Sequence, residues 1–289
     1  LSLVGSEMCI RDSLTAVEAV LADPGLAEAN LMVLAGYGSD IVELAWDEQK
    51  QTLQSALLSL YEPAIEDEAF NLLNRASVLA AWAEVATATL EEGEQLAADK
   101  VDWAVAHADQ FVAALNSYQL HAGINSLWGV YYDLGLEDRA QQTLALGIER
   151  SKAPFYFMSG MGYVELEAGN EADALIWYRK AWEATSRPLD RSRWGWGYVR
   201  RVLTLTPENT GEIARASSLL LADLVSQNDG LDVYEKRLQG MGGQLLAWSG
   251  DSPERESVVI GLRDQMTAHC DGLPREHPEP AVCRSFLFP

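Results

Sequence analysis

The sequence predicts an all-α protein, built as an array of antiparallel helix pairs that ends in an irregular C-terminal tail. Three observations support this prediction. Alanine and leucine are common whereas valine and isoleucine are sparse, which favours helix over strand. Apolar residues recur at helical spacing, and no stretch of useful length alternates as a strand would. Residues 121–188 also contain an internal repeat whose period is that of helix pairs.

The repeat appears when residues 121–188 are compared with themselves at an offset of 34 residues. The identities that result include those that align Gly135 with Gly169, Glu137 with Glu171, Ala140 with Ala174 and Pro154 with Pro188. The spacing resembles the tetratricopeptide repeat (TPR), a helix–turn–helix unit, and therefore implies a TPR-like α-solenoid. The expected helices are 121–134, 137–150, 155–168 and 171–186.

Small residues recur where the paired helices should cross, because only a small side chain lets two backbones approach. They are Gly135, Ala140, Gly147, Gly162, Gly169, Ala174 and Ala181, and the large residues beside them are Trp128, Tyr131, Leu144, Tyr178 and Trp182. Glu165 occupies a position where the pattern has an aromatic residue, and Trp128 occupies one where it has glycine. The repeats are therefore degenerate, and helices on both sides must cap their apolar flanks.

The segments on both sides of the repeats are also expected to be helical. In residues 14–120 we expect helices at 14–22, 26–35, 39–61, 63–92 and 94–118, separated by Asp23-Pro24-Gly25, Gly36-Tyr37-Gly38, Pro63 and Gly93. In residues 189–269 we expect capping helices at 191–205, 213–225, 231–248 and 253–269. The proline-rich tail, residues 270–289, should be irregular. We expect one helical body with a weak seam near residues 93–99.

Residues 1–13, with the sequence LSLVGSEMCIRDS, fit no helix of this scheme. They resemble the translation of a sequencing-library adapter, so we exclude them from fold reasoning and leave Cys9 out of the cysteine count. A genuine N-terminal tail is the alternative. If the segment is an adapter, the native start is missing, and the lack of a leader peptide says nothing about location.

The net charge of -22, from 43 acidic and 21 basic residues, limits the classes of partner. An acidic surface repels phosphate backbones, so we expect no nucleic-acid binding. No apolar run reaches the ~18 residues that a membrane span needs. A solvated acidic surface is the simplest explanation of the charge.

The charge reverses locally at residues 179–201, where basic and aromatic residues alternate. Arginine forks there could hold a carboxylate or a phosphate, and a peptide C-terminus or an acidic segment of a partner would suit them. The predicted binding residues are Arg191, Arg193, Trp194, Trp196, Tyr198, Arg200 and Arg201, with Arg179, Lys180 and Arg187 nearby. The alternative is structural: the tryptophans pack in the core and the arginines pair with the abundant acids.

Cys270 and Cys283 both lie in the tail. A disulfide between them would stabilise the tail by about 3 kcal/mol in the loop-entropy model and would imply an oxidising compartment. Two free thiols, or a metal site that includes His269 and His277, are the alternatives. A redox-active pair is disfavoured, because the Cys-x-x-Cys spacing that lowers a thiol pKa is absent.

The sequence contains no recognisable catalytic constellation. None of the 4 histidines lies in a His-Glu-x-x-His motif or near a Gly-x-Ser-x-Gly turn, and no glycine-rich phosphate loop occurs. His107 and His121 are interpreted as helix-surface or core residues. We therefore expect no catalytic residue, no cofactor and no metal.

Residues 100–289 resemble the helical region of bacterial envelope proteins of the thioredoxin family, which includes thiol–disulfide interchange proteins. The matching stretches are 153–158 (APFYFM), Arg193-Trp194-Gly195, Tyr198-Val199, Leu205-Thr206-Pro207, 243–248 (GQLLAW) and the two tail cysteines. The resemblance implies a periplasmic or otherwise exported location and a thioredoxin-like domain upstream. Because this chain has no Cys-x-x-Cys motif, the redox site of the family corresponds to no residue here.

The functional prediction is a non-catalytic helical-repeat interaction or scaffold module, the C-terminal part of such an envelope protein. Its partner would be a protein or peptide, acidic where it meets the arginines, held in a groove near Arg193 and Trp194. The alternative is thiol–disulfide oxidoreductase function, carried mainly by a missing N-terminal domain.

Overall fold

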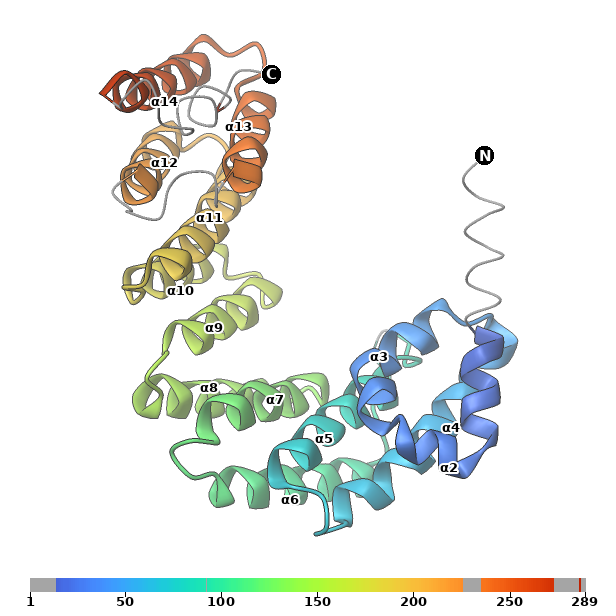
Figure 1. The fold of residues 1–289 in the computed structure, drawn as a ribbon. Coiled ribbons are helices and arrows are strands. Elements are labelled where there is room, and N and C mark those ends of the chain that lie inside the picture. Colours follow the sequence, from blue (N-terminus) through green and yellow to red (C-terminus); the bar gives the residue numbers. More distant parts are fainter. Residues whose placement is uncertain (1–13, 92, 226–234, 273–285, 287–289) are drawn as a thin grey trace. The chain divides into compact units, whose positions relative to one another are not determined.

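The computed structural model describes residues 14–91, 93–225, 235–272 and 286, and all regular structure in these ranges is helical. The all-α prediction is therefore confirmed. The helices form two compact units, Leu1–Ala153 and Pro154–Pro289, which are described separately here (Figure 1). The boundary between the units falls between the two predicted repeats, and not near residues 93–99.

Unit 1 opens with helical residues 14–22, and seven further helices follow. They are α2 (Pro24–Ala29), α3 (Leu31–Leu44), α4 (Asp47–Glu66), α5 (Leu72–Thr87), α6 (Ala98–Ala114), α7 (Leu120–Asp133) and α8 (Glu137–Arg150). Helices α3, α5 and α7 pack side by side, α4 packs on α3 and α5, α6 packs on α5 and α7, and α8 packs on α7. Because α5 contacts both α6 and α7, it closes the seam that was expected near residues 93–99.

The Gly36-Tyr37-Gly38 stretch does not end a helix, contrary to the prediction, and α3 runs through it. Gly38 serves close packing instead, since a Cβ there would lie 2.6 Å from the Tyr61 hydroxyl. That hydroxyl donates a hydrogen bond of 2.7 Å to the carbonyl of Leu34. Ser39 was expected to cap the next helix, but its hydroxyl donates to Glu84 at 3.1 Å.

Helix starts near the prolines also differ from the prediction. Asp23 caps α2 directly, because its carboxylate accepts from the backbone N–H of Gly25 at 3.0 Å, so Asp23-Pro24-Gly25 begins a helix. Pro63 lies inside α4 instead of starting a helix. The next helix begins only at Leu72, where the Asn71 side chain accepts from a backbone N–H in the first turn.

Unit 2 contains α9 (Phe155–Glu167), α10 (Glu171–Glu183), α11 (Pro188–Leu205), α12 (Thr210–Val225), α13 (Glu235–Ser249) and α14 (Pro253–Gly272). Successive helices from α9 to α12 pack on one another, α13 packs on α11, and both α12 and α13 pack on α14. Trp182, Leu220 and Leu262 lie in its core, together with Phe286 from the tail. Helix α14 extends past Cys270, so the tail that was expected to be irregular from residue 270 begins as helix.

The two predicted repeats correspond to α7–α8 and α9–α10, and their turns have the same backbone geometry. Gly135 and Gly169 both adopt positive φ, 72° and 80°, which glycine tolerates best. The first helix of each repeat ends in the same pair of backbone hydrogen bonds. In the first repeat, the N–H of Gly135 donates to the Tyr132 carbonyl and the N–H of Leu136 to the Tyr131 carbonyl. In the second, the N–H of Gly169 donates to the Leu166 carbonyl and the N–H of Asn170 to the Glu165 carbonyl. This is the Schellman arrangement, so the repeat in sequence corresponds to a repeated local structure.

The described helices include none that is both long enough and apolar enough to cross a bilayer.

Candidate functional site

Arg191, which was predicted to bind a ligand, forms its contacts with other residues of unit 2. Its Nε donates to Asp223 Oδ2 at 2.8 Å, its Nη2 also contacts that carboxylate, and its Nη1 donates to the carbonyl of Thr185 at 3.2 Å. The guanidinium carbon lies 5.7 Å from the ring centre of Trp182. These contacts join α11 to α10 and α12, which is the arrangement that the structural alternative predicts.

Arg201, Trp194 and Trp196 are likewise held by packing. The Arg201 guanidinium lies 3.8 Å from the ring centre of Tyr178, a cation–π contact. Trp194 meets the rings of Phe155 and Tyr156 edge-on, with centroids 5.6 and 5.2 Å away. Both tryptophans pack against the core of unit 2. Among the predicted binding residues, Arg193 and Arg200 are the two exposed arginines.

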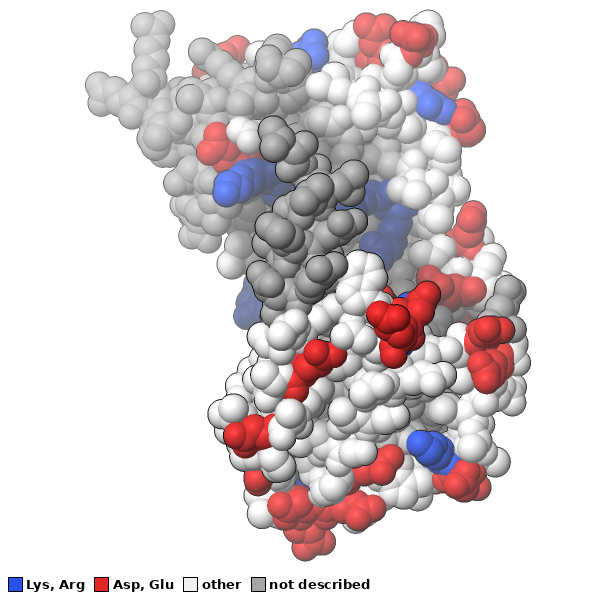
Figure 2. Space-filling model, turned by 90° about the vertical axis from the view of Figure 1, so that its right-hand side faces the viewer, with Lys and Arg blue, Asp and Glu red and all other residues white. Residues whose placement is uncertain are grey.

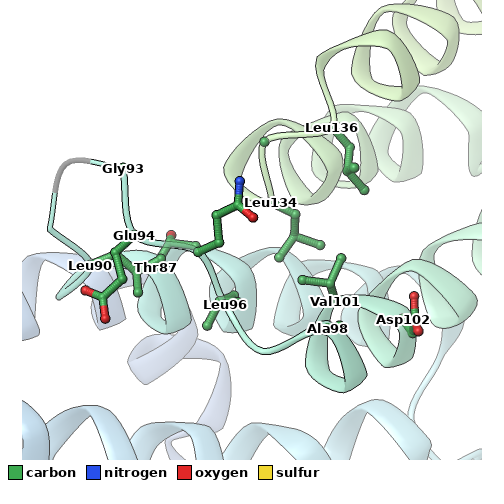
Figure 3. A pocket seen from close by; sticks show the side chains of 12 residues that line it. Thr87, Leu90, Gly93, Glu94, Leu96, Ala98, Val101, Asp102, Leu134 and Leu136 are labelled. Atoms are coloured by element: carbon green, nitrogen blue, oxygen red, sulfur yellow. The ribbon is translucent and has the colours of Figure 1, made fainter.

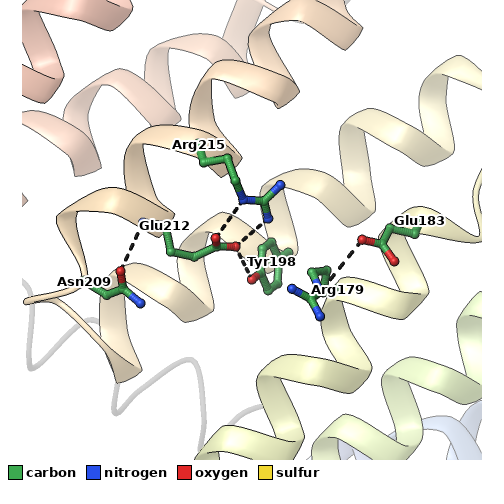
Figure 4. A network of polar contacts seen from close by, with 6 residues as sticks. All are labelled: Arg179, Glu183, Tyr198, Asn209, Glu212 and Arg215. Carbon is green, nitrogen blue, oxygen red and sulfur yellow. Dashed lines mark hydrogen bonds and ion pairs between the residues drawn. The ribbon is translucent and has the colours of Figure 1, made fainter.

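Tyr198 belongs to a polar network at the start of α12 (Figure 4). Its hydroxyl donates to Glu212 Oε1 at 2.5 Å, and Arg215 donates to both oxygens of the same carboxylate, at 2.7 and 2.8 Å. The hydrogen bonds from Arg215 lower the pKa of Glu212 despite its partial burial. Burial raises the pKa of Tyr198, and the neighbouring carboxylate raises it further. The negative charge of Glu212 is therefore compensated within the protein.

Arg179 lies beside this network but is held much more loosely. Its Nε is 3.8 Å from Glu183 Oε1, with side-chain exposures of 44% and 65%. Figure 4 shows the two side chains paired along α10, with the Arg179 guanidinium near Tyr198. An exposed pair at this distance contributes about 0–1 kcal/mol, so a ligand carboxylate can replace Glu183 at little cost.

A hollow of about 240 Å³ opens between α10, the end of α11 and the start of α12, and we call it the α10–α12 hollow. Its lining residues are Leu175, Ile176, Arg179, Tyr198, Thr206, Asn209 and Glu212. Tyr198 is the one predicted binding residue among them. The sequence did not predict the other lining residues, because they come from separate segments of the chain and form no linear motif. The one sequence signal for this site was Arg179, which lies at the edge of the basic and aromatic cluster.

Unit 1 has a larger cavity, of about 460 Å³, between the α5–α6 connection and the α7–α8 turn. Leu96, Val101 and Leu134 supply apolar side chains, while the carboxylates of Glu94 and Asp102 lie on opposite sides of it (Figure 3).

Asp133, at the end of α7, is the carboxylate with the most raised pKa that the structure describes. Burial raises its pKa to about 7, and the negative charge of Glu84 adds to the effect. His107 contacts the Trp103 carbonyl through Nδ1 at 2.9 Å and packs against the Trp103 ring at a tilt of 50°, which is a structural role. In the described ranges, no group of three His, Cys, Asp or Glu residues is placed to hold a metal ion.

Cys270 is 3% exposed and packs in the core of unit 2 near Met266. Cys270 is disulfide-bonded, so it is neither a free thiol nor a metal ligand. Cys283 and His277 lie outside the described residues, so the pairing of Cys270 with Cys283 stays a prediction. Residues 1–13 lie outside the described ranges too.

Comparison with known proteins gives no family assignment: no protein-family model matches the chain, and no curated protein matches it either.

Proposed function

We propose that this chain is a non-catalytic helical-repeat module that binds an acidic protein or peptide partner through unit 2. The observation that carries the proposal is the α10–α12 hollow, in which the weakly paired Arg179 lies beside a carboxylate whose charge is already compensated. In the hollow, the Arg179 guanidinium can therefore bind an anionic ligand, while the carboxylate of Glu212 is already paired with Arg215.

The other lining groups suit a peptide. Leu175 and Ile176 provide apolar surface for a side chain. The side-chain Oδ1 of Asn209 accepts from the backbone N–H of Glu212 at 3.1 Å, which leaves the side-chain NH₂ of Asn209 able to donate to a ligand carboxylate or carbonyl. The Thr206 hydroxyl donates to the Val202 carbonyl at 3.2 Å, and its oxygen can still accept. The hollow thus holds a second donor besides Arg179.

The test is an array of acidic peptides, probed with the intact chain and then titrated in solution. We expect selected peptides to bind the wild type, and Arg179→Glu to weaken them by at least about tenfold, since the variant replaces attraction by repulsion. Arg150→Glu is the charge-matched control, because Arg150 is exposed at the end of α8 in unit 1. It should change affinity by less than about twofold.

Two results would count against the proposal. One is an array without any binder although the protein is folded by circular dichroism. The other is a set of binders that respond equally to Arg179→Glu and to Arg150→Glu, which would mean that the peptides sense only net charge.

An origin in an exported thioredoxin-family protein remains part of the proposal and rests on the sequence resemblance of residues 100–289. Thiol–disulfide exchange by this chain is the weaker candidate, because an exchanging thiol must be reachable and Cys270 is almost fully buried. A reduction potential for the tail cysteines below about -300 mV would support a structural bridge, whereas a higher potential would favour exchange.

A further inference from the structure

We propose a second interaction surface, in unit 1, that takes a basic amphipathic helix of a partner protein. The surface is a groove of about 420 Å³ between residues 14–22, α2 and α4, which we call the α2–α4 groove. Leu21, Leu31, Leu60 and Phe70 form apolar parts of its lining, and Glu28 and Asp67, its two charged lining residues among those that the structure describes, are both acidic.

The electrostatic surroundings select a cationic occupant. No Lys, Arg or His occurs from Leu14 to Gln49, and the lysines and arginines of residues 14–120 are Lys50, Arg75 and Lys100. Lys50 pairs with Asp47 at 3.3 Å, and Arg75 donates to the Ile65 carbonyl at 2.7 Å. Figure 2 shows acidic side chains in separate groups across the face that it draws, with basic ones mainly in its upper half.

The polar groups of the groove also select a cation. The Glu28 side chain makes no hydrogen bond or ion pair within the described ranges, and Asp67 uses one oxygen to accept from the N–H of Ala69 at 2.8 Å. The Ser59 hydroxyl already donates to the Ser55 carbonyl at 2.8 Å. The groove therefore presents carboxylate acceptors and apolar surface, which match Lys or Arg beside Leu-type side chains.

The apolar lining favours a helix over an extended peptide. The walls are helices whose backbone groups are paired internally, so they offer no ladder of hydrogen bonds to an extended chain. A helix satisfies its own backbone groups and can place apolar side chains in the groove at i, i+4 and i+7 while basic residues reach the rim.

The probe is a fluorescent helical peptide with leucines on one face and lysines on the other, and the comparison is its leucine–glutamate counterpart. We expect the lysine peptide to bind the intact chain saturably and the glutamate peptide to bind at least about tenfold more weakly. Glu28→Lys/Asp67→Lys should weaken the lysine peptide by at least about tenfold, and Leu60→Ala should weaken it independently of charge.

A protein with net charge -22 could bind any cation loosely, so the control must change charge equally elsewhere. Asp138→Lys/Glu149→Lys does so on exposed positions of α8, outside the groove. Tyr37→Ala removes an apolar side chain that is exposed but does not line the groove. Equal effects of both charge reversals, equal effects of Leu60→Ala and Tyr37→Ala, or equal binding of both peptides would each overturn the proposal.

Discussion

The two concave surfaces differ in what they leave unpaired. The α10–α12 hollow holds Glu212, whose carboxylate is bound by Arg215 and Tyr198, and leaves Arg179 loosely held. The α2–α4 groove has no basic lining residue and leaves Glu28 unpaired within the described part of the chain. The charge of the ligand that each surface attracts therefore depends on which of its own charged side chains are paired, and not on the net charge of the chain.

The two helix pairs α7–α8 and α9–α10 differ in another way. Their turns are alike, but the residues near the helix crossing differ in size: Trp128 and Leu144 in the first pair correspond to Gly162 and Tyr178 in the second. Gly162 is required in the second pair, since a Cβ there would lie 2.9 Å from the Tyr178 ring. The turn is thus repeated while the packing is specific to each unit.

The largest effect is expected for the core of unit 2. Trp182 is fully buried, and Trp182→Ala should reduce the free energy of unfolding by about 3–5 kcal/mol, through lost burial and a cavity. Trp177→Ala is the matched control, because Trp177 is only partly buried and lies against Lys180 at 4.1 Å. Urea unfolding followed by circular dichroism measures both. Equal losses would mean that the core of unit 2 is not centred on Trp182.

The similarity of the turns is tested by Gly135→Ala and Gly169→Ala. Each substitution forces an L-residue into positive φ, so each should cost about 1–2 kcal/mol. The two costs should agree to within about 0.5 kcal/mol, because the turns make the same hydrogen bonds. Gly197→Ala, at a helical position without a close neighbour, should be neutral or stabilising. Unequal costs would break the equivalence of the turns.

The two carboxylates Asp133, in unit 1, and Glu212, in unit 2, should respond oppositely to pH. The folded pKa of Asp133 is raised to about 7, so folding favours its protonated form, and its contribution to stability falls as the pH rises from 4 towards 7. Asp133→Asn should therefore stabilise the protein by about 1 kcal/mol at pH 8 and have little effect at pH 4. The folded pKa of Glu212 is lowered, so its contribution is present at neutral pH and lost as the pH falls below about 4.5.

Urea titrations of the wild type, Asp133→Asn and Glu212→Gln between pH 3 and pH 8 separate the two contributions. A gain from Asp133→Asn that is as large at pH 4 as at pH 8 would contradict the raised pKa. Glu212→Gln should instead cost most at neutral pH, since it removes the charge that Arg215 binds.

The smallest effect is expected for Arg200→Glu. Arg200 is exposed and was predicted from sequence to bind a ligand, but it does not line the α10–α12 hollow. The variant should weaken acidic peptides by less than about threefold, against at least about tenfold for Arg179→Glu. If the order of the two effects were reversed, the binding site would be the basic and aromatic cluster itself.

The fold class followed from the sequence because helical spacing and the 34-residue period are local signals. Where the predicted helix boundaries were wrong, a residue that commonly ends or starts a helix has a different role in the folded protein. Gly38 was predicted to end a helix, but it lies within α3 and leaves space for the side chain of Tyr61, a residue of another helix. Pro63 suggests a helix start, yet α4 contains it.

The candidate site was harder to predict for the same reason. Arg191 and Arg201 belong to the same basic stretch of sequence as Arg179. Which of these arginines is bound within the protein, and which can bind a ligand, depends on their neighbours in the folded structure. Asp223, which binds Arg191, and Tyr178, which lies under Arg201, belong to different helices. No spacing in the sequence shows that Asn209 and Thr206 line one hollow with Arg179.

The most direct test of the opposed surfaces is a crossed binding experiment with the intact chain. An acidic peptide selected on the array and the leucine–lysine helix are each titrated into the wild type, Arg179→Glu and Glu28→Lys/Asp67→Lys. We predict that Arg179→Glu weakens the acidic peptide alone and that the double variant weakens the lysine helix alone, each by at least about tenfold. If either variant weakened both ligands, or neither, the two surfaces would not be separate binding sites.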